Sequence, residues 1–319
     1  MSTLVFLEHH GSSIQRGALG VLSKAAQIDP DTVGVIIGSG VREVAAEAGK
    51  YGAKKVYVAD DASLAAPLPQ PRVDVISKLV ADQGIDNVLF GASVLASDVA
   101  GGVAARLGAG LNWDLNDVES GGDGLVGKRA ALQDTVVVDV GWTQTPRLGL
   151  FRAGSFDPAE NGGSAEVEDV AVALEDFSSK AEMVDQAHEE QSGPSIEEAD
   201  ILVTGGRGLG EAEKFSMLED LASALGGAVA STRAVVDSGW YPYPTQIGQT
   251  GKVVSPKLYI GAGVSGAIQH KVGMQTSQVI VAINKDPNAP IFEFSDLAIV
   301  GDLNDVVPKL TELVKARKG

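Results

Sequence analysis

Short apolar segments alternate with longer amphipathic segments along the first hundred residues. The short segments are rich in Val, Ile and Leu and predict buried strands, whereas the alanine-rich stretches between them have helical spacing. Such alternation is typical of strand and helix units that build a parallel sheet covered by helices. The predicted strands are 3–10, 33–40, 54–60 and 87–94, and the predicted helices are 13–28, 41–49, 71–84 and 95–110.

The pattern changes between about residues 115 and 175. Strand-like segments with turn residues between them, as in "TVVVDVGWTQTPRLGLFRAGSF", predict an antiparallel extension that completes this domain. Residues 175–200 are polar and acidic and contain Ser-Gly-Pro, which is the composition of a linker. We therefore predict an N-terminal α/β domain over residues 1–194 and a second domain over residues 195–319.

The alternation of strands and helices restarts after the linker, without any repeat of fixed period. Each domain is therefore predicted to be α/β, with a largely parallel sheet flanked by helices. The strand-like segments of the second domain are 201–210, 227–240, 257–263, 278–287 and 297–302, and its predicted helices are 211–226, 265–274 and 303–317.

Composition excludes several classes of function. The formal charge of −17 argues against nucleic-acid binding, which depends on clustered Lys and Arg. The absence of cysteine excludes disulfides, thiolate metal sites and cysteine nucleophiles. The four histidines have no metal-ligand spacing, and no G-x-S-x-G nucleophile motif occurs. Without a signal-peptide pattern or an apolar run of about 18 residues, the chain is expected to be cytoplasmic, with no membrane insertion.

Gly261, Gly263 and Gly266 spell G-x-G-x-x-G between a predicted strand and a predicted helix. This context suits a dinucleotide phosphate turn, although the same glycines also suit a plain strand-to-helix turn. A nicotinamide site also needs an acidic residue about 20 positions later. Asp286 is near that spacing but precedes Pro287, as expected of a turn residue. An NAD(P)-dependent dehydrogenase remains one alternative.

A second glycine-rich turn, at 203–210, contains Arg207, which is suited to binding a phosphate. Parallel strands end at a common edge, so both turns are expected to open there. Arg233 is a further candidate, although a surface ion pair is the more common role of such an arginine. The loop 245–252 offers polar groups but lacks the nucleotide-hydrolase phosphate-loop motif. His270 alone is more often a packed residue than a functional one.

Five motifs in this order and spacing resemble the FAD domain of the electron transfer flavoprotein alpha subunit: "GGRGLG", "STRAVVDSGW", "IGQTGK", "YIGAGVSGAIQHKVGM" and "VAINKDPNAPIF". The resemblance implies a Rossmann-like FAD-binding domain at the C-terminus. It also implies an N-terminal domain that packs with the beta subunit of a heterodimer. The implied activity is electron carriage without substrate turnover, from acyl-CoA and other dehydrogenases to a membrane quinone oxidoreductase. A nucleotide-binding regulatory protein without redox chemistry is the third possibility.

The resemblance also assigns residues to the cofactor. His270 would present a donor, ideally a cation, to the N1 and C2 carbonyl edge of the flavin, and Thr250 would donate to N5. Arg233 would add a permanent positive charge. Thr232 departs from the family, which usually has Ser there, but it keeps a hydroxyl. The predicted FAD contacts are Arg207, Thr232, Arg233, Ile247, Gly248, Gln249, Thr250, Ser265, Gly266, Ala267, Ile268, Gln269, His270 and, toward the adenosine, Asn284, Asp302 and Leu303.

Overall fold

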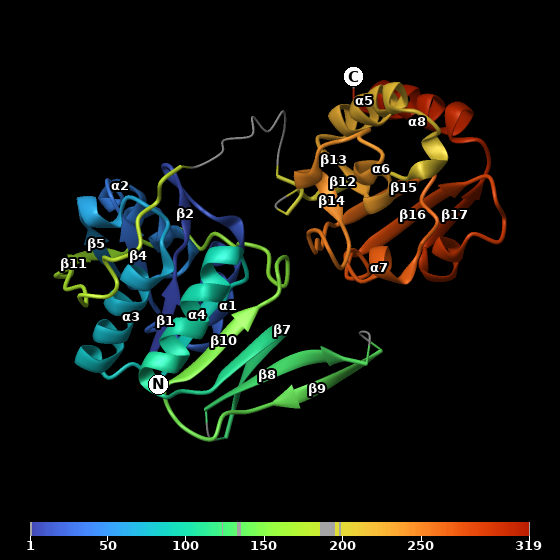
Figure 1. Cartoon of the computed structure of the whole chain (residues 1–319). Helices are drawn as coiled ribbons and strands as arrows, with labels where there is room; N and C mark the ends of the chain where they lie inside the picture. The colour runs from blue at the N-terminus through green and yellow to red at the C-terminus, as the bar shows by residue number, and fades with distance from the viewer. Residues whose placement is uncertain (1, 123, 133–134, 186–194, 198, 319) are drawn as a thin grey trace. The chain divides into compact units, whose positions relative to one another are not determined.

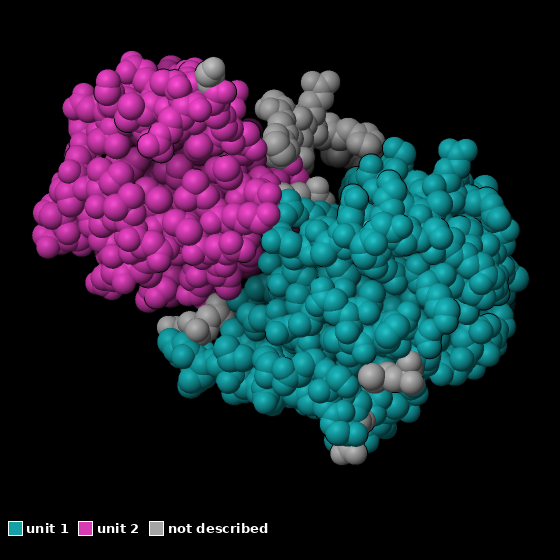
Figure 2. Space-filling model, turned by 180° about the vertical axis from the view of Figure 1, so that it is seen from behind, with its two compact units in different colours: residues 1–188 teal, residues 189–319 magenta. Residues whose placement is uncertain are grey.

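The chain folds into two compact units, residues 1–188 and 189–319, which Figure 2 distinguishes by colour. This is a computed structural model that describes residues 2–122, 124–132, 135–185, 195–197 and 199–318. Each unit has its own sheet and its own buried core, so each is described by itself. The predicted boundary after residue 194 lies at the end of 186–194, which is outside the described residues.

Unit 1 is a sheet with a hydrophobic cluster on each face (Figure 1). Helices α3 and α4 cover one face and α1 and α2 the other, and β2 and β3 form a small separate hairpin. The strand order is β11-β5-β4-β1-β6-β10-β7-β8-β9. The strands are β1 (Thr3–Phe6), β2 (His9–His10), β3 (Ser13–Ile14), β4 (Val33–Gly38), β5 (Lys55–Asp60), β6 (Asn87–Gly91), β7 (Leu111–Gly121), β8 (Gly124–Ala131), β9 (Val136–Val140), β10 (Arg147–Phe151) and β11 (Glu166–Asp169), and the helices are α1 (Arg16–Ile28), α2 (Arg42–Ala45), α3 (Pro69–Gln83) and α4 (Val94–Leu107).

The predicted antiparallel extension is right for part of its range and wrong for the rest. Strands β7, β8 and β9 pair antiparallel. By contrast, β10 inserts between β6 and β7 and is parallel to both, and β11 pairs parallel with β5. The β10 sequence "RLGLF" is almost fully buried, as expected of an internal strand with both edges paired.

Unit 2 is a parallel sheet with the strand order β14-β13-β12-β15-β16-β17, which is the 3-2-1-4-5-6 order of dinucleotide-binding folds. Together with unit 1 this confirms an α/β fold with largely parallel sheets flanked by helices. The strands are β12 (Ile201–Gly205), β13 (Ala228–Thr232), β14 (Gln246–Ile247), β15 (Leu258–Ala262), β16 (Val279–Asn284) and β17 (Leu297–Val300), and the helices are α5 (Phe215–Leu225), α6 (Arg233–Asp237), α7 (Ile268–Lys271) and α8 (Leu303–Lys318).

One predicted helix of unit 2 is much shorter than expected. The segment 265–274 contains only the single turn α7, because Gly266 adopts a left-handed conformation at φ +85° just before it. After it, a Cβ at Gly273 would lie 2.4 Å from the backbone nitrogen of Gly248, so the chain is pressed against another loop. Within the described residues, every helix is too short or too polar to cross a membrane.

Candidate functional site

The two glycine-rich turns lie side by side where the strand order of the parallel sheet of unit 2 reverses. Strand β12 lies between β13 and β15, and Gly205 pairs with Ala262 at the carboxyl ends of β12 and β15. The backbone N–H of Gly206 donates to Ala262 O at 3.0 Å, and that of Gly208 to Gly263 O at 3.0 Å. The predicted opening of both turns at one edge is confirmed. In open α/β sheets, ligands bind at such a switch point.

The glycines of these turns are required by contacts within the protein. A Cβ on Gly206 would lie 2.3 Å from Gly263 O, and one on Gly208 would lie 2.7 Å from Gly263 Cα. Gly263 is also left-handed, at φ +65°. A Cβ on Gly266 would lie 2.3 Å from the backbone nitrogen of Ile291. These glycines therefore allow the turns to pack backbone against backbone, so their presence alone does not identify a ligand.

Backbone donors at the second turn do point to a ligand. The N–H groups of residues 264–269 have no hydrogen-bond acceptor among the residues that the structure describes. Ser265, Ala267, Ile268 and Gln269 in this run are exposed. Consecutive free backbone N–H groups on a fixed turn form a concave donor surface that suits an anion, phosphate above all.

Arg207 adds a charge to the same edge of the sheet. It lies at the start of a short 3₁₀ turn, Arg207–Leu209, and is exposed. Its guanidinium has no ion-pair or hydrogen-bond partner within the described part of the chain. On the other side of the turn, Asn284 Nδ2 donates to Val264 O at 2.9 Å and holds the backbone in place. The donor set fits a phosphate-bearing ligand such as a dinucleotide.

The loop that contains Thr250 presents a hydroxyl hydrogen. Gln246, at 3% exposed, donates its Nε2 to Thr250 Oγ1 at 3.1 Å. Because an amide nitrogen only donates, the Thr250 hydroxyl accepts this bond and its own hydrogen stays available to a further acceptor. Tyr243 Oη donates to Thr250 O at 3.1 Å and fixes the loop from the other side. The geometry suits the predicted donor role of Thr250.

The His270 ring is turned into the core. Only 7% of the residue is exposed, and its ring nitrogens lie 2.7 Å from Tyr259 Oη and 3.2 Å from Ile247 O. Burial lowers the pKa of His270 to about 4, against the backbone hydrogen bond to Ile247, which raises it. The ring is therefore neutral at neutral pH. Donation to the flavin, as expected from the sequence, requires one of the two ring nitrogens to leave its present partner.

The other predicted contacts have mixed surroundings. Arg233 Nε pairs with Asp237 across one helical turn at 3.3 Å, with both side chains about two-thirds exposed, so the ion pair is weak. Thr232 is half-buried, and its side chain makes no capping bond to α6. Asp302 precedes α8 and accepts from the backbone N–H and the side-chain amide of Asn304, and these hydrogen bonds lower its pKa.

Two more residues singled out from the sequence, Leu303 and Asp286, follow the second turn along the chain. Leu303 is buried beside Gly263, where a Cβ would lie 2.9 Å from Leu303 Cδ2. Asp286 Oδ1 accepts from the backbone N–H of Asn288 at 2.9 Å, so it caps a turn as its position before Pro287 suggested. Asp286 therefore has a local role in the turn, and none of its contacts favours the ribose-binding role on which the nicotinamide alternative depends.

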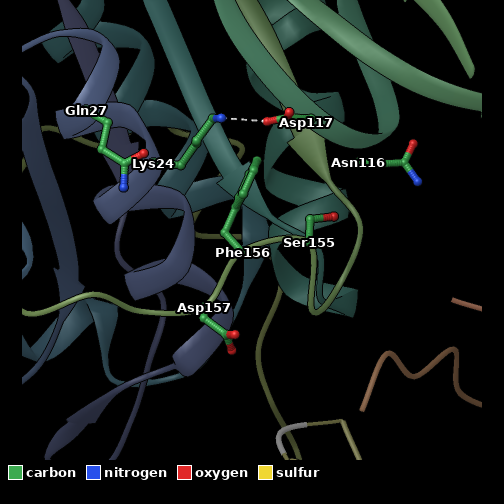
Figure 3. Close-up of a pocket in the computed structure, with 7 residues that line it drawn as sticks. All are labelled: Lys24, Gln27, Asn116, Asp117, Ser155, Phe156 and Asp157. Carbon is green, nitrogen blue, oxygen red and sulfur yellow. Dashed lines mark ion pairs between the residues drawn. The ribbon is translucent and has the colours of Figure 1, made fainter. Parts of the chain in front are cut away.

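A separate pocket of about 400 Å³ lies in unit 1 (Figure 3). It is bordered by α1, β7 and the segment after β10. Lys24 Nζ pairs with Asp117 at 2.8 Å and lies 5.6 Å from the centre of the Phe156 ring. Its cation is thus neutralised within the pocket. None of the cofactor residues predicted from the sequence lines it, and no motif in the sequence indicated it.

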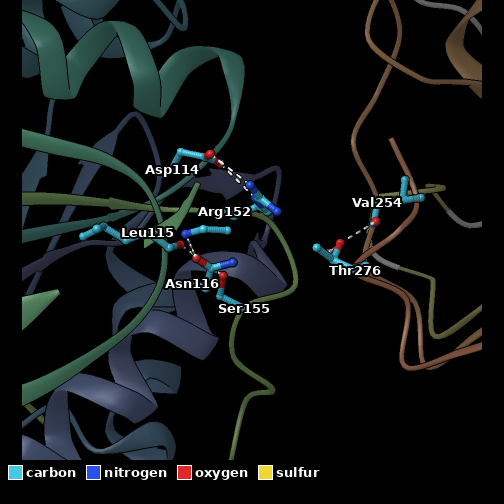
Figure 4. A network of polar contacts seen from close by, with 9 residues as sticks. Asp114, Leu115, Asn116, Arg152, Ser155, Val254 and Thr276 are labelled. Carbon is cyan, nitrogen blue, oxygen red and sulfur yellow. Dashed lines mark hydrogen bonds and ion pairs between the residues drawn. The ribbon is translucent and has the colours of Figure 1, made fainter. Parts of the chain in front are cut away.

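Unit 1 also contains a strained backbone position that the sequence did not indicate. Asp114 in β7 has φ +61°, which is uncommon for a residue with a Cβ. Its carboxylate forms a two-point ion pair with Arg152, at 2.8 and 2.9 Å (Figure 4). Ser155 Oγ, three residues after Arg152, donates to Leu115 O at 3.3 Å. These bonds hold the strained residue in place.

Comparison with known protein families supports a flavin cofactor. A family model described as "Electron transfer flavoprotein domain" matches residues 3–175. A second, described as "Electron transfer flavoprotein FAD-binding domain", matches residues 195–275. The second match includes both glycine turns, the Thr250 loop and α7. The cofactor for which the donor set was tested above is therefore FAD.

Full-length relatives give the same result. A protein named electron transfer flavoprotein subunit alpha from Mycobacterium leprae is 40% identical over 99% of both chains. One of the same name from Bacillus subtilis is 39% identical over 90% of this chain and 88% of its own. A Caenorhabditis elegans protein named probable electron transfer flavoprotein subunit alpha, mitochondrial, is 37% identical over 97% and 92%.

Gly206→Ala tests the contact between the two turns. The added Cβ would lie 2.3 Å from the backbone oxygen of Gly263. The two turns must separate to relieve this clash, so we expect unit 2 to lose about 1–3 kcal/mol of unfolding free energy. Because the donor turn is displaced, bound FAD should also fall after desalting. Urea titration and flavin absorbance measure the two effects.

Gly210→Ala is the matched control in the same turn. Gly210 is left-handed at φ +88°, but a Cβ there meets nothing within 4 Å. The left-handed backbone alone should lower the free energy of unfolding, by about 1–2 kcal/mol, and FAD should be retained. Equal FAD loss in both variants would contradict a specific role for the contact at Gly206.

Proposed function

The chain belongs to the family of electron transfer flavoprotein alpha subunits, and from this premise we propose that it holds FAD at the switch point of unit 2 and carries electrons between other proteins. When bound, FAD supplies a group that accepts and returns electrons one or two at a time. The observation that supports this best is the run of free backbone N–H groups at residues 264–269, with Arg207 at the same edge.

Different residues would bind different parts of the cofactor. The amides of 264–269 and Arg207 are proposed to bind the pyrophosphate. Thr250 is proposed to donate to the flavin ring, since Gln246 already occupies its oxygen as a donor. Gly248, Gln249 and Ile247 would line the same side. Asn284, Asp302 and Leu303 would border the adenosine end, from the carboxyl end of β16 and the start of α8.

Family membership implies a heterodimer with a beta subunit, and we propose that unit 1 provides the contact. Strand β9 is one edge of the sheet, and Val136, Val137 and Val138 are 43%, 64% and 40% exposed, so apolar side chains are exposed on both of its faces. In Figure 1, β8 and β9 reach beyond the helical layers of unit 1. An exposed apolar edge strand is a ready site for pairing with another chain.

The donors and the acceptor follow from the family in the same way. We propose acyl-CoA dehydrogenases and other dehydrogenases as donors and a membrane quinone oxidoreductase as acceptor. In this role the chain has no substrate of its own to convert. The exposed turn at 265–269 would leave the cofactor close to solvent, which suits a carrier that must approach several partners.

The decisive test is the colour of the purified complex. The chain co-expressed with its beta subunit should show the absorbance bands of a flavin in the blue and near-ultraviolet, at one FAD per heterodimer in this site. A colourless complex would reject the proposed function. Expression of the chain alone is a poorer test, because the partner completes the heterodimer.

Arg207→Ala tests the proposed pyrophosphate contact. Loss of a charged hydrogen-bond donor should raise the FAD dissociation constant by about ten- to a hundredfold. Arg317→Ala, an exposed arginine on α8, is the control and should bind FAD like the unaltered chain. Equal FAD affinity in both variants would show that Arg207 makes no contact with the phosphates.

Val137→Glu tests the proposed partner surface. A charge placed in an apolar contact loses its hydration, so we expect at least about tenfold weaker association with the beta subunit. Val184→Glu, at a position 94% exposed in the same unit, is the control. Sedimentation of the two variants with the beta subunit measures the effect. Unchanged association of Val137→Glu would exclude β9 from the interface.

A further inference from the structure

A buried polar contact joins β15 to α7 inside unit 2. Tyr259 is fully buried, and its hydroxyl lies 2.7 Å from His270 Nε2. On the other side of the imidazole, Nδ1 lies 3.2 Å from the carbonyl oxygen of Ile247 in β14. The ring therefore links three elements: β14, β15 and α7. Buried polar groups with all partners satisfied tend to fix one arrangement of the chain around them.

The chemistry of the partners determines where the protons lie. A carbonyl oxygen only accepts, so His270 Nδ1 must bear the hydrogen in its contact with Ile247. In the neutral ring, Nε2 is then an acceptor, and the hydroxyl of Tyr259 must donate to it. The hydrogen bonds thus run in one direction, from Tyr259 through His270 to Ile247.

Gly261, the first glycine of G-x-G-x-x-G, makes room for this contact. A Cβ on Gly261 would lie 3.0 Å from Tyr259 Cε1 and 3.4 Å from Tyr259 Oη. It would also lie 3.0 Å from Ile291 Cδ1 on the other side. A side chain at 261 would therefore press on the phenol ring. Gly261, which is part of a motif typical of phosphate-binding turns, thus leaves space for the Tyr259 ring.

The contact joins the two segments that are proposed to hold the flavin. Ile247 begins the loop that contains Thr250, and His270 ends the turn with the free N–H groups. A backbone bond from Gln249 N to Gln269 O, at 2.8 Å, runs alongside. Without the Tyr259 hydroxyl the buried Nε2 lone pair has no donor, while Nδ1–H still bonds Ile247 O. A buried acceptor without a partner costs free energy, so the link between the two segments is weakened.

We propose that Tyr259 is a positioning residue: its hydroxyl donates to Nε2 of the His270 tautomer that the Ile247 carbonyl sets, and so holds the Thr250 loop against the turn 264–269. The link to flavin binding rests on the proposed function, whereas the tautomer rests on the geometry alone. In this arrangement the neutral His270 ring connects the two segments that are proposed to bind the cofactor.

The tautomer can be read directly by nitrogen NMR of the heterodimer labelled with ¹⁵N-histidine. The His270 signals are identified by their absence in His270→Gln. In the unaltered protein, Nδ1 should have the shift of a protonated nitrogen and Nε2 that of an unprotonated one. In Tyr259→Phe, which removes one oxygen and keeps the ring, the Nε2 shift should change as its hydrogen bond is lost, while Nδ1 stays protonated. A protonated Nε2 in the unaltered protein would overturn the proposal.

The rate of FAD release supplies the second readout. Tyr259→Phe should release FAD about tenfold faster, as expected when one hydrogen bond that holds the site is lost. Tyr241→Phe is the matched control, because it removes a hydroxyl in the same unit that bonds Glu219 at 3.0 Å and is remote from His270 in the chain. FAD release and the His270 shifts should be unchanged in this control.

The outcomes separate this proposal from the proposed function. A Tyr259→Phe variant with altered shifts but unaltered FAD release would overturn the positioning role. An unaltered Nε2 shift in that variant would overturn the hydrogen bond from Tyr259. In a preparation without flavin, which would reject the proposed function, the His270 shifts still decide whether Tyr259 donates to Nε2. Should Tyr259→Phe fail to fold, the shifts of the unaltered protein remain decisive.

Discussion

The close approach of two backbone turns determines what unit 2 can do. The turn after β12 lies against the turn after β15 with hydrogen bonds from Gly206 to Ala262 and from Gly208 to Gly263, and a Cβ at either donor glycine would collide with the opposite turn. Because one side of the second turn is occupied in this way, its N–H groups at 264–269 remain available on the other. A binding surface made of backbone is rigid when its supporting side is packed, which is what recognition of a fixed anion needs.

The location of this site was predictable from the sequence, but the orientation of its most prominent side chain was not. Strand and helix alternation places both glycine turns at one edge of a parallel sheet. His270, however, was expected on a helix that begins near residue 265. The left-handed Gly266 delays the helix until Ile268, and the ring then lies beside Tyr259. The spacing of residues along the chain indicates neither the left-handed conformation of Gly266 nor the contact with Tyr259, eleven residues earlier.

Unit 1 shows a second limit of pattern analysis. Alternation with period two identifies a strand but not its direction, so β10 was expected in an antiparallel extension and is instead parallel to both its neighbours. The strand inserts beside β6 because its apolar residues are buried there. The left-handed Asp114 in β7 likewise has no sequence signal, because its conformation depends on Arg152, 38 residues later in the chain. Both features depend on pairings between distant segments.

The groups at the proposed flavin site share a property that matters for an electron carrier. The backbone N–H groups of 264–269 have fixed dipoles, and Arg207 contributes a guanidinium charge. Burial keeps His270 neutral, because the pKa of about 4 lies well below neutrality. The field from these groups therefore stays constant across the neutral range. The energy of adding an electron to the cofactor would then depend on the positions of the two loops, and the contact between Tyr259 and His270 ties those loops together.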